Sequence, residues 1–150
     1  MQIQQEPSPG NECKLAYAAG YFDGEGTINV LSCKGRFQLR VELTSYDLDS
    51  LRVFEELFGG EVRSDEFAGV NFQVYRWAKN NKHAIKVLRR LVPFLKSKRK
   101  QAELALDSGW DFQSPGGPRL TEIQIEKRAA LYRALKEAKA ENKRGKTVAR

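Results

Sequence analysis

Two carboxylates at one end of a short apolar segment are the residues best suited to chemistry in this chain. Asp23 and Glu25 follow the run 15–22, whose small and aromatic residues favour a helix. The carboxyl end of a helix carries partial negative charge and free carbonyl oxygens, so acidic side chains are disfavoured there. Carboxylates beside such carbonyls form an all-oxygen ligand set of the kind that Mg²⁺ prefers. The pattern therefore indicates a divalent metal site where this helix ends.

The same segment carries a stripe of small residues. Ala16, Gly20 and Gly24 recur every four positions and therefore share one helix face. Each glycine costs a helix up to about 1 kcal/mol relative to alanine, so the stripe indicates that another surface approaches this backbone closely. The alternative is a tightly packed core helix followed by a glycine-rich turn, with both carboxylates simply solvated.

Composition limits the classes of protein that fit. The chain has 150 residues, enough for one domain with a substantial core. It has 26 Lys and Arg against 19 Asp and Glu, a net charge of +7, which favours a polyanionic partner, nucleic acid first and an anionic membrane second. Two cysteines are too few for a disulfide framework or a zinc site. The single histidine, His83, argues against histidine-dependent nucleases and triads, so catalysis must use carboxylates, lysines and a metal.

Targeting signals are missing from the sequence as given. No apolar run approaches the ~18 residues of a membrane helix, and MQIQQEPSPG has no signal-peptide pattern. We therefore expect a soluble intracellular protein, of a bacterial cytoplasm or an organelle, with no membrane partner and no small-molecule cofactor.

Hydrophobic periodicity predicts the elements that must position these residues. They are, in order, a helix over 12–23, strands over 27–33 and 36–45, a helix over 47–58, strands over 61–65 and 69–77, and helices over 79–91 and 98–107. This order predicts an α+β domain with an antiparallel sheet and helices on one face. The expected organisation is a flexible arm (1–12), a core (13–112), a linker (113–119) and a basic C-terminal helix with a tail (120–150).

Capping residues predict where two of the later helices begin. Ser97 is a candidate cap for the helix over 98–107, and Thr121 with Gln124 three positions on forms a capping box for the basic C-terminal helix. That last helix has an apolar side that could pack on the core, formed by Ile125, Tyr132, Leu135 and Ala138.

Both strand pairs alternate between apolar and polar residues. Leu39 and Val41 are expected to point inward, as is Val74 in the second pair. The polar face can simply face water, or it can lie in a DNA major groove, where Arg and Gln read guanine and adenine. Under the second interpretation the DNA-binding residues are Asn29, Gln38, Arg40, Glu42, Thr44, Arg63, Asn71, Gln73 and Tyr75.

The run 18–26, AAGYFDGEG, resembles the signature of the LAGLIDADG homing endonucleases, with a single motif per chain. In that family two motif helices pack through their small residues, and the last acidic residue of the motif binds the catalytic metal. The resemblance implies that Glu25 and the Gly24 carbonyl bind Mg²⁺, which Mn²⁺ or Ca²⁺ could replace. It also implies an α-β-β-α-β-β-α core and a helix interface formed by Ala16, Ala19, Gly20, Asp23 and Gly24.

A second stretch, 92–104 or VPFLKSKRKQAEL, resembles the family's Pro-aromatic-Leu run before a lysine-rich helix start. It implies that Lys98 reaches the catalytic pocket, near the phosphate and water that hydrolysis brings together. Lys96, Arg99 and Lys100 would contact backbone phosphates or neutralise charge. The alternative is a solvated basic helix end, the usual meaning of such a charge run.

The sequence departs from the family pattern after the second strand. Many members have a glutamine there that orders water around the metals, and in this chain Ser45 occupies that position. We keep Ser45 as a candidate catalytic position, although the substitution puts the water network in doubt. Asp47, in the same run, is better explained as a helix cap.

One motif per chain implies a homodimer that recognises a near-palindromic DNA site. The resemblance implies a Mg²⁺-dependent, staggered double-strand break and a role in intron or intein mobility. One rival is a catalytically inactive relative, such as an intron maturase or a DNA-binding regulator. A second rival is a basic structural protein whose glycine stripe only mediates dimerisation.

Overall fold

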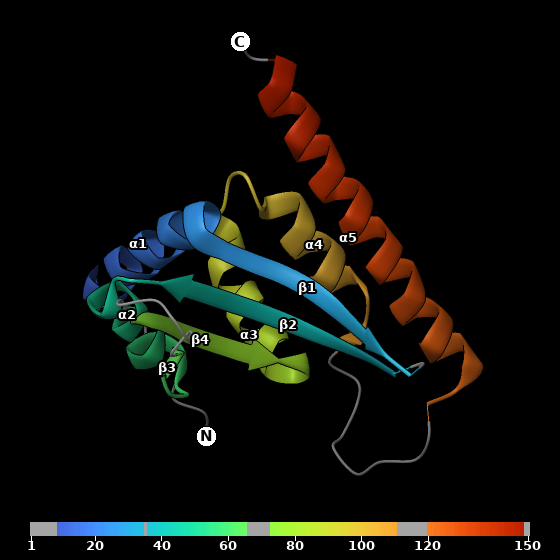
Figure 1. Cartoon of the computed structure of the whole chain (residues 1–150), viewed down its shortest axis with the longest axis horizontal. Helices are drawn as coiled ribbons and strands as arrows, with labels where there is room; N and C mark the ends of the chain where they lie inside the picture. Colours follow the sequence, from blue (N-terminus) through green and yellow to red (C-terminus); the bar gives the residue numbers. More distant parts are fainter. Residues whose placement is uncertain (1–8, 35, 66–72, 111–119, 149–150) are drawn as a thin grey trace.

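The computed structural model describes residues 9–34, 36–65, 73–110 and 120–148. The elements follow the predicted order, including the two helices expected after residue 91 (Figure 1). They are α1 (Pro9–Glu25), β1 (Gly26–Cys33), β2 (Arg36–Ser45), α2 (Leu48–Phe58), β3 (Arg63–Asp65), β4 (Val74–Asn80), α3 (Asn81–Leu91), the short 3₁₀ helix η1 (Val92–Phe94), α4 (Arg99–Asp107) and α5 (Glu122–Val148). The α+β prediction is confirmed. The expected linker, 113–119, lies outside the described residues.

The strands form one antiparallel sheet in the order β1-β2-β4-β3. β1 and β2 pair from Gly26 opposite Leu43 to Cys33 opposite Arg36, and Lys34 takes the positive φ of 50° that their turn requires. In Figure 1, α1, α2 and α3 lie behind the sheet, and its other face carries none of them. This uncovered side is called the open face below.

The core lies between the sheet and these three helices. Phe22 of α1, Phe54 of α2 and Trp77 of β4 are fully buried there. The Trp77 ring contacts Phe54 with centroids 5.3 Å apart, and its indole Nε1 donates to the Gly59 carbonyl at 3.0 Å. This packing fixes the end of α2 against the sheet.

The central strand β2 supplies its own share of the core. Leu39, Val41 and Leu43 lie on the same face of this strand, and all three side chains are fully buried. They are the apolar half of the predicted alternation, which their burial confirms for β2.

Two predicted helix starts are confirmed at the level of hydrogen bonds. The Asp47 carboxylate accepts from the Ser50 amide at 3.2 Å and from the Ser50 hydroxyl at 2.6 Å, and these bonds lower the pKa of Asp47. At the start of α5, the Thr121 hydroxyl accepts from the Gln124 amide at 3.3 Å, while the Gln124 side chain accepts from the Thr121 amide at 2.9 Å. Both arrangements satisfy amides that the first turn of a helix leaves unpaired.

The second strand pair differs from its prediction. β4 covers Val74–Asn80 and so extends past the predicted end at 77, while residues 69–72 of the predicted strand lie outside the described residues. Trp77 takes the buried face because it is the largest apolar side chain of the strand. Side chains alternate along a strand, so Tyr75 shares the helix-covered face with Trp77. The expected assignment of Tyr75 to the polar face is therefore wrong, and Arg76 lies on the open face instead.

α5 joins the domain along β1 and α4. Its expected apolar side is confirmed at Leu135 and Ala138, which are buried, whereas Ile125 is 39% exposed. Arg128 donates to the Phe37 carbonyl at 3.0 Å and lies 4.2 Å from the centre of the Trp110 ring. None of the helices in the described part of the chain has the length and apolarity that crossing a membrane requires.

Gly26, where α1 passes into β1, has no room for a side chain. A Cβ atom there would lie 2.3 Å from Cδ2 of the buried Phe22 ring. We expect Gly26→Ala to lower the free energy of unfolding by about 1–3 kcal/mol, the usual cost of overpacking a core. Urea denaturation measures this effect. Gly10→Ala is the control, because a Cβ at Gly10 meets nothing within 4 Å; equal stability of the two variants would contradict the prediction.

Candidate functional site

The carboxyl end of α1 is joined to the turn that precedes α4. The Asp23 carboxylate accepts from the backbone amides of Lys96, at 2.7 Å, and Lys98, at 3.0 Å. The Asp23 carbonyl accepts from the Lys98 ammonium at 2.5 Å and from the Ser97 hydroxyl at 3.2 Å. These bonds place Lys98 at the end of the motif helix, next to the exposed residues Gly24 and Glu25.

This contact also changes two expected roles. Ser97 does not cap α4, because Lys98 occupies the N-cap position and the Ser97 hydroxyl bonds to α1. Asp23 was expected at a helix interface, but its carboxylate is used within the chain to hold the 96–98 turn. The structure therefore joins Lys98 to Asp23, two residues before the predicted metal ligand Glu25.

The small-residue stripe of α1 faces away from the core of its own chain. Ala16, Gly20 and Gly24 are exposed, and a Cβ at either glycine would meet nothing within 4 Å. The opposite side of the helix carries Phe22 and Ala19, both fully buried. The interpretation of the stripe as part of a packed core is therefore wrong, and Ala19 is corrected from an interface residue to a core residue.

Most of the predicted polar residues share the open face. Asn29 pairs with Arg40, Arg40 with Asn80, and Thr44 with Arg76, while Arg63 pairs with Arg76 from the other side. Gln38 and Glu42 each lie two positions from Arg40 along β2, so their side chains point to the same face as that of Arg40. Gln73 is exposed and precedes β4, and Asn71 lies outside the described residues. Arg76 and Asn80 were not among the open-face residues predicted from the sequence. Placing Trp77 on the buried face of the strand would have predicted Arg76 on the opposite, open face, and Asn80 with it.

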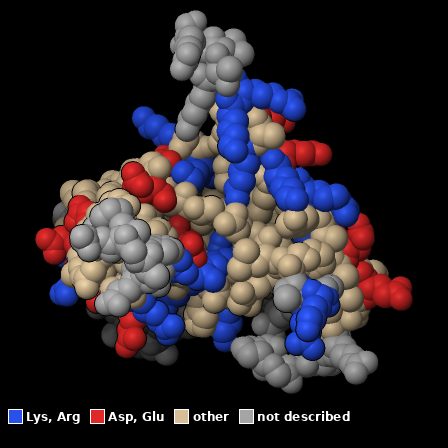
Figure 2. All heavy atoms as spheres, viewed as in Figure 1, with Lys and Arg blue, Asp and Glu red and all other residues tan. Residues whose placement is uncertain are grey.

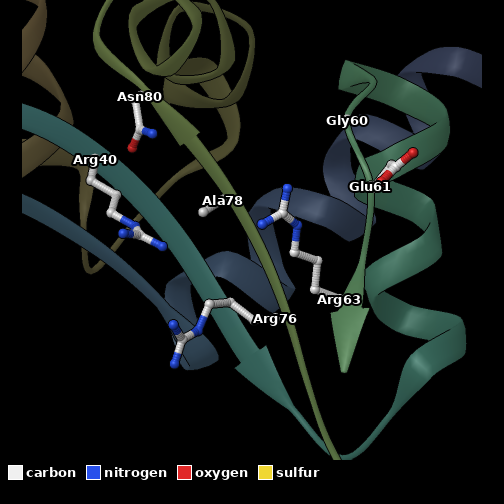
Figure 3. A pocket seen from close by; sticks show the side chains of 7 residues that line it. All are labelled: Arg40, Gly60, Glu61, Arg63, Arg76, Ala78 and Asn80. Atoms are coloured by element: carbon white, nitrogen blue, oxygen red, sulfur yellow. The ribbon is translucent and has the colours of Figure 1, made fainter. Parts of the chain in front are cut away.

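The open face contains a hollow of about 420 Å³ lined by arginines. Figure 3 shows the side chains of Arg40, Arg63 and Arg76 around it, with Asn80 at one end. Glu42 lies between two of them, because its Oε2 is 2.7 Å from Arg40 Nε and its Oε1 is 3.8 Å from Arg76 Nε. Figure 2 shows further Lys and Arg side chains along α5. The hollow is therefore suited to a ligand with anionic groups or hydrogen-bond acceptors.

The fold matches solved structures, although the sequence matches no protein-family model and no curated protein. The archaeal intron-encoded homing endonuclease I-Vdi141I, solved with DNA, aligns with a TM-score of 0.63 at 19% identity, covering 85% of this chain and 84% of that one. I-CvuI, solved with DNA and Mg, aligns with a TM-score of 0.57 at 18% identity, covering 85% and 98%. The chain has the LAGLIDADG homing endonuclease fold.

The length of this chain corresponds to a whole chain of some neighbours and to part of others. It covers 98% of I-CvuI. It covers 43% of the LAGLIDADG meganuclease I-AabMI, solved with uncleaved DNA, with a TM-score of 0.55 at 21% identity. The resemblance seen in the motif at 18–26 is thus confirmed at the level of the fold.

The predicted metal ligands lie together at the end of α1. Glu25 and the Gly24 carbonyl are oxygen ligands suited to Mg²⁺. Within the described residues, however, no three His, Cys, Asp or Glu side chains gather as a metal-binding group.

The remaining predicted residues have other contacts. The Ser45 hydroxyl accepts from the Tyr21 hydroxyl at 2.7 Å and from the Asp47 amide at 3.1 Å, on the side of the helices, and its role near the metal stays a prediction. Arg99 pairs with Glu103 at 3.2 Å, and Lys100 pairs with Glu141 at 2.7 Å. Lys96, Arg99 and Lys100 are all exposed, as phosphate contacts would require.

Proposed function

We propose that this protein is a site-specific homing endonuclease that cleaves both strands of a long, near-palindromic DNA site as a homodimer. The proposal is supported above all by the hydrogen bond from the Lys98 ammonium to the carbonyl of Asp23, two residues before Glu25. Phosphodiester hydrolysis requires an activated water and stabilisation of the charge that develops on the phosphate. A carboxylate for a metal and a fixed ammonium group meet these two needs.

The exposed stripe on α1 supports the homodimer. Gly20 and Gly24 leave open space where a second copy of the helix could approach the backbone closely. Two copies related by a two-fold axis would bring two Glu25 carboxylates to adjacent helix ends. A two-fold protein matches a two-fold DNA sequence, so the target is nearly palindromic.

The chemistry divides between the metal and the chain. Glu25 and the Gly24 carbonyl would hold Mg²⁺, which supplies an activated water and neutralises charge when bound. Lys98 is partly buried, and its hydrogen bond to the Asp23 carbonyl fixes its position. Its ammonium group stabilises the additional negative charge of the phosphate as the bond breaks.

The open face binds the DNA. Arginines read guanine through two hydrogen bonds in the major groove, so Arg40, Arg63 and Arg76 favour guanines in the target. Glu42 is a positioning residue, because its carboxylate lies between Arg40 and Arg76. Lys96, Arg99 and Lys100 add phosphate contacts, so affinity falls steeply as salt concentration rises.

Arg76→Ala should relax the choice of base at one position of each half-site. Losing a guanine contact reduces discrimination between bases by about 1–3 kcal/mol, which is about 5-fold to 150-fold in affinity. Tyr75→Phe is the matched control, since Tyr75 lies on the helix-covered face. Binding-site selection from a randomised duplex library measures both. A variant that kept its base preference at every position would contradict the role of Arg76.

The proposed reaction is tested by incubating the full chain with a randomised DNA library and Mg²⁺. We expect cleavage at one near-palindromic sequence, with a staggered break in both strands, and no cleavage in EDTA. Such a result would also give the target. Cleavage without sequence preference, or in one strand only, would contradict the proposal.

The second candidate is a nucleic-acid-binding relative without catalytic activity, acting as an intron maturase or a regulator. It is favoured by one observation: Ser45 stands in place of the family's glutamine, and its hydroxyl bonds to Tyr21 and Asp47. This candidate predicts salt-sensitive selection of one DNA or RNA sequence without metal-dependent cleavage. A role in intron or intein mobility, inside the cell, belongs to the first candidate.

A further inference from the structure

One turn of α5 bridges β1 and the turn that carries Lys98. The Lys139 ammonium donates to the Asn29 side-chain oxygen on β1. Two and three residues further along, Glu141 pairs with Lys100 at 2.7 Å and Asn142 donates to the Ser97 carbonyl at 3.1 Å. Three contacts from neighbouring positions therefore hold this part of α5 against β1 and against the start of α4, and Figure 1 shows α5 running beside these two elements.

Lys139 lies in an unusual environment for a lysine. Burial and the nearby charge of Lys98 both lower its pKa, burial being the larger cause. Its hydrogen-bond partner is a neutral amide oxygen, whereas Lys100 pairs with a carboxylate. Two ammonium groups placed near each other repel, and a bound anion would relieve that repulsion.

The position of Lys139 relative to the open face indicates which kind of anion it could bind. Asn29 lies on the open face of β1, four residues after Glu25, and pairs with Arg40. Lys139 therefore reaches from α5 to the edge of the surface that binds DNA in the proposed function. An ammonium group has three N–H donors, and the bond to Asn29 uses one of them.

We propose that Lys139 is a second phosphate-binding lysine of the site, and that Lys139 and Lys98 together hold one backbone phosphate of the DNA. This proposal rests on the proposed function. It assigns α5, which the family resemblance left without a role, to the binding of the cleaved strand. A purely structural role, in which Lys139 only ties α5 to β1, is the alternative.

Salt-dependent DNA binding separates the two roles. The probe is the duplex selected from the library, bound by chains that carry Glu25→Gln so that no cleavage occurs. Lys139→Gln should lower the slope of log affinity against log salt by about 0.9, the value for one phosphate contact. Lys139→Arg should retain the slope because it keeps the charge. Lys86→Gln is the control: it removes the same charge from an exposed position on α3, in the helix layer.

A double-mutant cycle tests the shared phosphate. If Lys98 and Lys139 hold the same group, Lys98→Gln combined with Lys139→Gln should weaken binding by less than the product of the two single effects. Thermal unfolding checks that each variant is folded. We expect α5 to stay in place in these variants, because it is anchored by the buried side chains of Leu131, Leu135 and Ala138. A Lys139→Gln variant with lower thermal stability but the salt slope of Lys86→Gln would overturn the proposal.

Inorganic phosphate distinguishes a failure of this proposal from a failure of the proposed function. In NMR spectra of lysine-labelled protein, added phosphate should shift the Lys98 and Lys139 side-chain signals together. Shifts without any selection of DNA would keep the phosphate site and overturn the endonuclease. DNA selection and cleavage with an unchanged Lys139 salt slope would keep the endonuclease and overturn the second lysine.

Discussion

Glu25→Gln is expected to reduce metal-dependent DNA cleavage by at least about 100-fold. Mutation of a residue that only supports a metal ligand typically lowers metal affinity or activity by about 10- to 100-fold. The loss of a direct carboxylate ligand should therefore lower activity by at least the upper end of that range. Glutamine has nearly the same shape but no charge, and Glu25 is exposed, so the fold should be preserved. Cleavage rates on the selected duplex, with and without Mg²⁺, measure the effect.

The control for this variant is Glu12→Gln, which makes the same change at an exposed position in the first turn of α1. It should cleave as fast as the parent chain. DNA binding by Glu25→Gln, measured separately, should persist because the arginines of the open face are unchanged. Full cleavage by Glu25→Gln would remove Glu25 from the metal site and leave the binding protein as the better candidate.

If the chain forms the proposed homodimer, Gly20→Leu is expected to separate that dimer into folded monomers. Within one chain, a Cβ at Gly20 meets nothing within 4 Å. Leucine is also more favourable than glycine inside a helix, by slightly less than about 1 kcal/mol. In a closely packed helix pair the added atoms cost about 1–3 kcal/mol in each chain, twice per dimer. The dissociation constant should therefore rise at least about 30-fold. Sedimentation equilibrium measures it.

Lys86→Leu is the matched control, because it places a leucine at an exposed position of α3 instead. It should leave the dimer intact. Circular dichroism should show that Gly20→Leu keeps its helices, so that dissociation is not mistaken for unfolding. An intact Gly20→Leu dimer would place the contact between chains elsewhere, and the two-fold arrangement of Glu25 would have to be abandoned.

Local patterns in the sequence predicted the features that depend on neighbouring residues. The alternation in β2 predicted which face is buried, because side-chain direction repeats every two residues. Asp47 and the pair Thr121 and Gln124 predicted helix starts, because a cap bonds within the next three residues. The motif at 18–26 pointed to the fold for a similar reason, because its small residues and its acidic end lie close together in the sequence.

Tertiary structure decided the features that join distant segments. The register of β4 depended on where the Trp77 ring could be buried, so Tyr75 and Arg76 exchanged faces. Ala19 belongs to the core because α1 turns that side toward the sheet, which its size alone does not reveal.

The site itself shows the same division. The sequence by itself determined Glu25 and Lys98 as candidates, but the bond from Lys98 to Asp23 spans 75 positions, and that from Lys139 to Asn29 spans 110. No periodicity relates residues so far apart, because their contact depends on how whole helices pack against the sheet. Only the tertiary structure could decide that α5 brings Lys139 to Asn29 on β1.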